Sequence, residues 1–166
     1  MIMGNQRARL MIVCGLPGSG KTTLAKVLET RFGAIRFCPD EWLDELSINL
    51  YNEEKRAKIE ALQWKLAQDL LIRGVSVVIE WGTWARSERD TLRLRARELG
   101  VEVELHYLSA PVDVLFERIQ RRGTEEPPIK KEELIQWSKI FEAPTQEELA
   151  LFDPPLAADL VTGSFH

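Results

Sequence analysis

The stretch CGLPGSGKTTL, residues 14–24, decides the fold because it links an apolar run to an amphipathic segment. The run before it, LMIVC at residues 10–14, is apolar throughout, which is typical of a strand buried on both faces of a sheet. After it, over residues 20–32, apolar residues recur at the spacing of one helix face. The glycines between them predict a tight turn from a buried strand directly into a helix.

The turn itself fits the pattern G-x-x-x-x-G-K-[ST] in full, as GLPGSGKT at residues 15–22. In such a loop the backbone N–H groups turn inward around a phosphate, and side chains at the glycine positions would block it. The following helix adds its free N–H groups and its dipole. We therefore predict a nucleoside triphosphate site. The expected nucleotide-binding residues are Gly15, Pro17, Gly18, Ser19, Gly20, Lys21, Thr22 and Thr23.

The motif also assigns chemistry to two side chains. Lys21 is predicted to be catalytic, because its ammonium can reach the β- and γ-phosphates. Thr22 is the predicted metal ligand, since its hydroxyl can bind the Mg²⁺ that bridges those phosphates. The alternative, a glycine-rich turn with Lys21 as a surface lysine, does not explain why the complete motif occurs between a strand and a helix. The expected cofactors are ATP and Mg²⁺.

Apolar strand-like and amphipathic helix-like segments alternate along the rest of the chain. Further strands are expected over 33–38, 75–82, 101–109 and 158–163. A long helix is expected over 53–73, with Ile59, Leu62, Leu66 and Leu70 on its apolar face. This alternation predicts an α/β fold, in which a parallel sheet of about five strands is sandwiched by helices. Residues 1–166 are expected to form one domain.

The composition narrows the class of protein. The net charge of −4 comes with acids and bases mixed along the chain, so a nucleic-acid partner is not expected. The two cysteines do not form a disulfide framework or a zinc motif. The N-terminal apolar run is too short for a signal peptide or a membrane span, which favours a soluble, cytoplasmic protein. The oligomeric state does not follow from these data.

Three stretches together resemble a group of small P-loop kinases: GLPGSGKTTLAKVL, the CPD at 38–40, and LSAPVDVLFERIQRR before a loop. The group includes the 5′-kinase domain of polynucleotide kinase, chloramphenicol phosphotransferase and zeta-toxin-like kinases. The segments VVIEWGTWARSERDTLRLRARELGVEVELHYL and FEAPTQEELALFD are most similar to bacterial proteins named only as AAA family ATPases or ATP-binding proteins. The resemblance implies a P-loop NTPase fold of the kinase type and an ATP-dependent phosphotransferase. It selects no acceptor.

In kinases of this type, an aspartate after the second strand accepts a proton from the attacking hydroxyl. The resemblance gives this catalytic role to Asp40, with the neighbouring Glu41 as its main rival. Helix capping or contact with a metal-bound water remain alternatives for Asp40.

The arginines before the loop at 123–130 suggest a lid. The spacing of Arg118 and Arg122 resembles an adenylate-kinase-like lid, which places Arg118 over the base and makes Arg122 catalytic at the phosphates. The loop is short and contains Pro127-Pro128, so a semi-rigid lid is expected. A basic helix end stabilised by the helix dipole is the alternative.

The end of the third expected strand supplies the remaining candidates. Glu80 occupies the place of the acid that holds the magnesium water shell or positions substrate, and the sequence leaves open whether Glu80 or Asp40 contacts the metal. By similarity, Arg86 and Arg89 would face the acceptor substrate, while a solvated helix start is their alternative. Trp84 could form a flat wall for the acceptor, although tryptophans at such positions also fill cores.

Three functions remain in competition. The preferred one is a kinase that moves the γ-phosphoryl group of Mg-ATP to a hydroxyl of a small molecule. The second keeps this reaction but uses a 5′-hydroxyl of a nucleic acid, which the acidic net charge disfavours. The third is a regulatory ATPase without an acceptor. GTPases are disfavoured because no [NT]KxD signature occurs, and ring-forming ATPases because 166 residues leave no room for their second domain.

Overall fold

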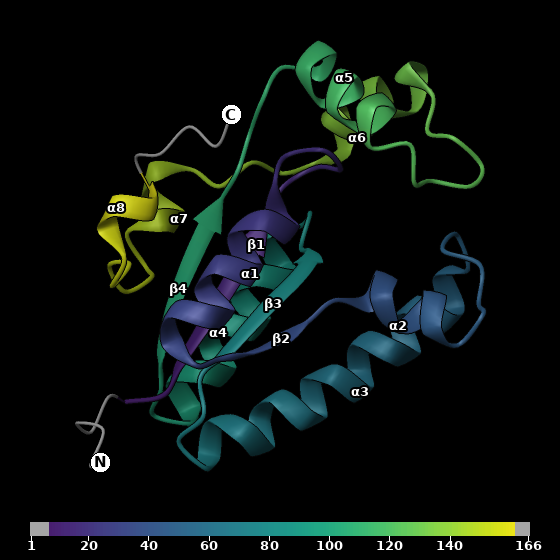
Figure 1. The fold of residues 1–166 in the computed structure, drawn as a ribbon. Helices are drawn as coiled ribbons and strands as arrows, with labels where there is room; N and C mark the ends of the chain where they lie inside the picture. The colour runs from purple at the N-terminus through teal and green to yellow at the C-terminus, as the bar shows by residue number, and fades with distance from the viewer. Residues whose placement is uncertain (1–6, 162–166) are drawn as a thin grey trace.

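A computed structural model describes residues 7–161, and in this range four strands form one sheet (Figure 1). All neighbouring strands pair in parallel, in the order β2-β3-β1-β4. The strands are β1 Arg9–Cys14, β2 Ile35–Phe37, β3 Val77–Gly82 and β4 Glu102–Tyr107. The predicted α/β class with a parallel sheet is confirmed.

Helices follow the strands as the alternation predicted. They are α1 Lys21–Phe32, α2 Pro39–Glu45, α3 Glu53–Ile72, α4 Arg86–Glu98, α5 Val112–Arg122, α6 Lys131–Ile140, α7 Gln146–Leu149 and α8 Ala158–Val161. None of those described is both long and apolar enough to cross a lipid bilayer.

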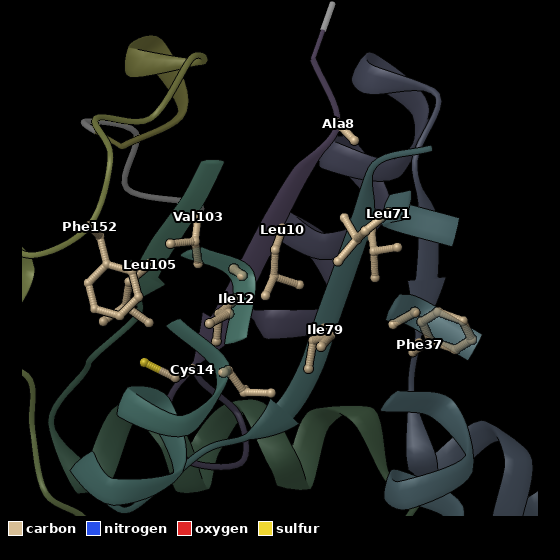
Figure 2. Packing of buried hydrophobic residues seen from close by; sticks show 14 residues of the cluster. Ala8, Leu10, Ile12, Cys14, Phe37, Leu71, Ile79, Val103, Leu105 and Phe152 are labelled. Atoms are coloured by element: carbon tan, nitrogen blue, oxygen red, sulfur yellow. The ribbon is translucent and has the colours of Figure 1, made fainter. Parts of the chain in front are cut away.

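Helices cover both faces of the sheet, because alternate residues of the central strands are apolar on both faces. On one face, Met11 and Val13 of β1 pack against α1, where Leu24 and Leu28 are buried. On the other face, α3 and α4 contribute Leu71 and Leu92, among others, to a larger cluster (Figure 2). Burial of both strand faces is what parallel sheets require.

The buried face of α3 differs from the prediction. Ile59 is buried as expected, but Leu62 and Leu66 are exposed, and Leu70 is only partly buried. The face that meets the sheet consists of Ile59, Gln63, Ala67 and Leu71. Gln63 can lie there because its side-chain oxygen accepts a hydrogen bond from Trp81 Nε1 at 2.8 Å, and the small Ala67 needs little space.

The predicted fifth strand over 158–163 is wrong for residues 158–161, which form α8, while 162–163 lie outside the described residues. The segment before α8 instead lies along β4. Asp153 N donates to Val103 O at 2.8 Å, and Val103 N donates to Asp153 Oδ2 at the same distance. Figure 2 shows Phe152 beside Leu105 of β4.

The pairing of β1 with β3 is irregular near the ends of both strands. Ile12 lies opposite Ile79, but Cys14 lies opposite Gly82, so β3 has an extra residue between these pairs. Such an irregularity bends a strand and changes the direction of its side chains. It falls at Glu80 and Trp81, next to the loop that connects β1 to α1.

Candidate functional site

The loop between β1 and α1 is tightly packed at two glycines. A Cβ atom on Gly15 would lie 2.5 Å from Leu108 O, and one on Gly18 would lie 2.7 Å from Leu115 O. Gly18 also has φ +82°, a conformation that residues with side chains rarely adopt. Both positions therefore require glycine, as the motif predicted.

The start of α1 presents backbone amides beside this loop. Its first helical hydrogen bond runs from Leu24 N to Gly20 O at 3.1 Å. The amides of Lys21, Thr22 and Thr23 precede that bond, so they have no acceptor within the helix. Free amides at a helix start, together with the helix dipole, favour an anion such as a phosphate.

The charges of the other two predicted catalytic residues, Asp40 and Arg122, act on the ammonium group of Lys21. Its Nζ donates to Leu16 O at 3.0 Å. Burial lowers the pKa of Lys21 to about 8, although the charges of Glu80 and Asp40 raise it, and Arg122 lowers it further. The charges of Glu80 in β3, Asp40 in α2 and Arg122 at the end of α5 thus all act on one ammonium.

Binding of a triphosphate should therefore take up a proton above about pH 8. Free Lys21 is partly neutral there, and phosphate oxygens would raise its pKa again, so affinity should fall as the pH rises. Calorimetry with AMPPNP and magnesium at about pH 8.5, in two buffers with different heats of ionisation, measures this uptake. Lys21→Met should bind weakly and without uptake. If wild-type protein takes up no proton on binding AMPPNP, the assignment of Lys21 to the phosphates is contradicted.

Thr22 and Glu80 form the corner in which a metal could be held. Thr22 Oγ1 donates to Glu80 Oε1 at 3.0 Å, and Arg36 Nη1 lies 3.3 Å from the same oxygen. The other oxygen, Glu80 Oε2, is buried and has no hydrogen-bond partner among the described residues. A threonine hydroxyl beside an unused carboxylate oxygen suits Mg²⁺, which usually keeps several waters and binds few protein ligands.

Asp40 lies in the first turn of α2, close enough to Lys21 for its charge to act on that ammonium. Its side chain is 59% exposed and forms an ion pair with Arg56 of α3. Helix capping gains no support, because the N-cap of α2 is Cys38 and makes no side-chain cap bond.

Glu60 lies on α3, one helical turn after Arg56. Burial raises the pKa of Glu60 to about 7. The charge of Arg56 lowers this pKa, and the charges of Glu88 and Asp40 raise it.

Glu41, the rival of Asp40 for the role of base, is occupied. Arg36 Nη2 lies 2.7 Å from both carboxylate oxygens of Glu41. Asp40 is paired in the same way with Arg56, so each of the two rival carboxylates has an arginine partner. The resemblance to small P-loop kinases therefore remains the ground for placing the base at Asp40.

The predicted lid joins α5 to α6 beside the P-loop. Arg118 Nη1 donates to Gly18 O at 3.3 Å, and Arg122 forms an ion pair with Glu125 of the lid. Tyr51, in the connection between α2 and α3, donates its hydroxyl to Pro127 O at 3.0 Å. The loop at 123–130 therefore contacts the connection between α2 and α3. The position of Arg118 over a base stays a prediction.

Arg89 does not occupy the expected place. Its side chain is completely buried, and its guanidinium binds Glu148 together with the backbone carbonyls of Thr83 and Glu142. It has no free donor for an acceptor substrate. Arg89 lies about one turn after the start of α4, on the face of the helix that is buried in the protein together with Leu92 and Ala96.

Arg86 and Trp84 are also engaged with other parts of the protein. The backbone N–H of Arg86 donates to Glu142 Oε2 at 3.0 Å, and its Nε lies 3.6 Å from Asp90. The ring of Trp84 lies 5.9 Å from that of Trp137 and 6.4 Å from that of Phe141. These contacts fix the segment after β3 against α6, and the roles of both residues toward a substrate stay predictions.

Sequence reasoning missed three charged residues of this site. Arg36 lies in a short strand between apolar neighbours, and a buried charge in such a place is a signal that could have been used. Arg56 and Glu60 are four residues apart on α3, and therefore share a helix face. Their partner Asp40 comes from another helix, which the sequence does not show.

Comparison with known families identifies this architecture. A family model described as an AAA domain matches residues 10–144. The chain belongs to this AAA domain family. Members of the family with this arrangement are P-loop kinase-like, nucleotide-binding phosphotransferases, in agreement with the small P-loop kinase resemblance seen in the sequence.

Individual relatives of this AAA domain chain are similar over most of its length. An adenylate kinase isoenzyme 6 homolog from Schizosaccharomyces pombe is 25% identical over 167 residues, which cover 98% of this chain and 87% of the relative. A gluconokinase structure from Sinorhizobium meliloti is 22% identical with a TM-score of 0.61, covering 86% of this chain and 79% of that one. A chain of the Pnkp1/Rnl/Hen1 RNA repair complex is 21% identical with a TM-score of 0.67, covering 89% of this chain and 47% of that chain.

Proposed function

We propose that the protein transfers the γ-phosphoryl group of ATP to a hydroxyl group of a small molecule. The observation that supports this most is the convergence of charges on Lys21. Asp40 from α2, Glu80 from β3 and Arg122 from α5 all act on its ammonium. A carboxylate near the phosphate loop can accept the proton of an attacking hydroxyl.

The residues of this chain have separate tasks in the transfer. The loop amides and Lys21 bind the phosphates and neutralise their charge. Asp40 accepts the proton of the acceptor hydroxyl, whose oxygen forms a bond to the γ-phosphorus while the bond to the bridging oxygen of ADP breaks. Arg122 contributes positive charge from the lid, where electrostatic stabilisation of the transferring group is most effective.

Magnesium fits the corner formed by Thr22 and Glu80. Thr22 would be the direct ligand, and the free oxygen of Glu80 would accept a hydrogen bond from the ion's water shell. When bound, the ion supplies charge neutralisation between the β- and γ-phosphate oxygens. No cluster of three or more His, Cys, Asp or Glu occurs in the described part of the chain, so the ion's other ligands would be water and phosphate.

The acceptor side favours a small neutral or cationic molecule over a nucleic acid. Asp40 lies on this side and is already paired with Arg56, so a phosphate backbone would meet a carboxylate there. The similarity to a chain of an RNA repair complex is the observation in favour of the nucleic-acid alternative, and any test must include it.

ADP formation should be measured with Mg-ATP and separate sets of acceptors: sugars and sugar acids, nucleosides, aminoglycosides and oligonucleotides with a 5′-hydroxyl. An acceptor should raise turnover at least about tenfold above ATP alone, and Lys21→Met should abolish the increase. Stimulation by oligonucleotides alone would replace the proposal with the nucleic-acid alternative. Rapid phosphate release without acceptor would favour a regulatory ATPase.

A further inference from the structure

Arg36 is a buried charge that the proposed steps do not use. It is the central residue of the three-residue strand β2, and only 9% of its side chain is exposed. In the sheet it pairs with Val78, two residues before Glu80, so Arg36 and Glu80 point to the same face.

Its guanidinium joins three carboxylates from three other elements. Nη2 lies 2.7 Å from both oxygens of Glu41 in α2, Nη1 lies 3.3 Å from Glu80 Oε1 in β3, and Nε lies 3.6 Å from Glu29 in α1. Burial lowers the pKa of Arg36, but the hydrogen bond to Glu41 and the charges of Glu80 and Glu41 raise it above its usual value. All three carboxylates therefore keep a cationic partner.

Glu80 depends on this partner. Its side chain is only 3% exposed, and its Oε1 accepts a hydrogen bond from the neutral hydroxyl of Thr22. A buried carboxylate without a cation nearby is costly and tends to become protonated or to turn toward solvent. With Arg36 and Thr22 both at Oε1, the oxygen Oε2 stays unused on the same buried carboxylate.

We propose that Arg36 is the positioning residue of the metal corner: it fixes Glu80 on the Thr22 hydroxyl, keeps one Glu80 oxygen free for the magnesium water shell, and pairs with Glu41. The inference rests on the proposed function, because it assigns Arg36 to that same site. Arg36 acts through the two glutamates: Nη2 is hydrogen-bonded to Glu41, while Nε and Nη1 are buried near Glu29 and Glu80 without a hydrogen-bond partner among the described residues.

The test is the magnesium dependence of AMPPNP binding, measured by calorimetry on the full chain in magnesium and in EDTA. Wild-type protein should bind more tightly with magnesium. In Arg36→Met this gain should fall by about 10- to 100-fold, as for other residues that orient metal ligands. The dissociation constant in EDTA should change less than about twofold, because the phosphate loop is not touched. Arg36→Lys should keep part of the gain.

Two controls separate this role from a general loss of charge or of folding. Arg95→Met removes an exposed arginine of α4 that pairs with Glu98, and should leave both constants unchanged. Glu80→Gln should lose the same magnesium gain as Arg36→Met, and the double variant should lose no more. If Arg36→Met does not fold, the gain in AMPPNP affinity with magnesium can still be compared between wild-type protein, Arg36→Lys and Glu80→Gln.

The outcomes are distinguishable from failure of the proposed function. If wild-type protein binds AMPPNP neither with nor without magnesium, the proposed function and this inference both fail. If wild-type binding depends on magnesium and Arg36→Met shows the same dependence, only the inference fails. If Arg36→Met loses the same factor of AMPPNP affinity in EDTA and in magnesium, Arg36 supports the phosphate loop instead, and the inference is overturned.

Discussion

Replacing Asp40 with asparagine should reduce phosphoryl transfer by about 100- to 10,000-fold, the usual contribution of a general base. Asparagine has nearly the same shape but cannot accept the proton of the acceptor hydroxyl. The carboxylate lies in the first turn of α2, accessible to solvent and held by Arg56, while Glu41 is bound to Arg36. Turnover and AMPPNP affinity should be measured together, and the affinity should be unchanged.

A matched control is available on the same helix. Asp44→Asn makes the same chemical change at an exposed position of α2 and should leave turnover unchanged. If Asp40→Asn turns over at the wild-type rate, another group accepts the proton. If it loses nucleotide affinity instead, Asp40 acts at the metal, which is the alternative that the sequence left open.

The second large effect concerns stability. Arg89→Met should lower the free energy of unfolding by about 3–5 kcal/mol, because it leaves Glu148 as an uncompensated buried charge. Arg89 Nε lies 2.6 Å from Glu148 Oε1, and both side chains are almost completely buried. Chemical denaturation measures the loss, and Arg95→Met serves as the exposed control.

The double variant Arg89→Met/Glu148→Leu shows whether the loss comes from the stranded charge. It should regain about half of the lost stability or more, since an apolar pair can replace a buried ion pair at little cost. The carbonyls of Thr83 and Glu142 would still lose their donor, which limits the recovery. A double variant as unstable as Arg89→Met would assign the effect to those carbonyls.

The phosphate loop and the strand–helix alternation could be predicted from the sequence because both are local patterns. The loop requires glycine at neighbouring positions, and the strands and helices differ in the period of their apolar residues. The covering of both sheet faces by helices then follows from general rules for parallel sheets, whereas the strand order β2-β3-β1-β4 was not predicted.

The burial and the ion-pair partners of individual charged residues could not be predicted in this way. Arg89 and Glu148 are 59 residues apart, and only the folded chain shows that they neutralise each other. The face of α3 was misjudged because large leucines were preferred over Gln63 and Ala67, and only the contact with Trp81 explains a buried glutamine. Each case depends on a distant partner, which periodicity does not encode.

The hydrogen bonds between Asp153 and Val103 also bear on which edge of the sheet another chain could join. A sheet edge with free N–H and C=O groups is a template on which another chain can add a strand. Here one side of the sheet ends in a strand of three residues, and the other is partly capped by Asp153 and the neighbouring Phe152. The segment before α8 thus occupies part of the edge on which another chain could otherwise add a strand.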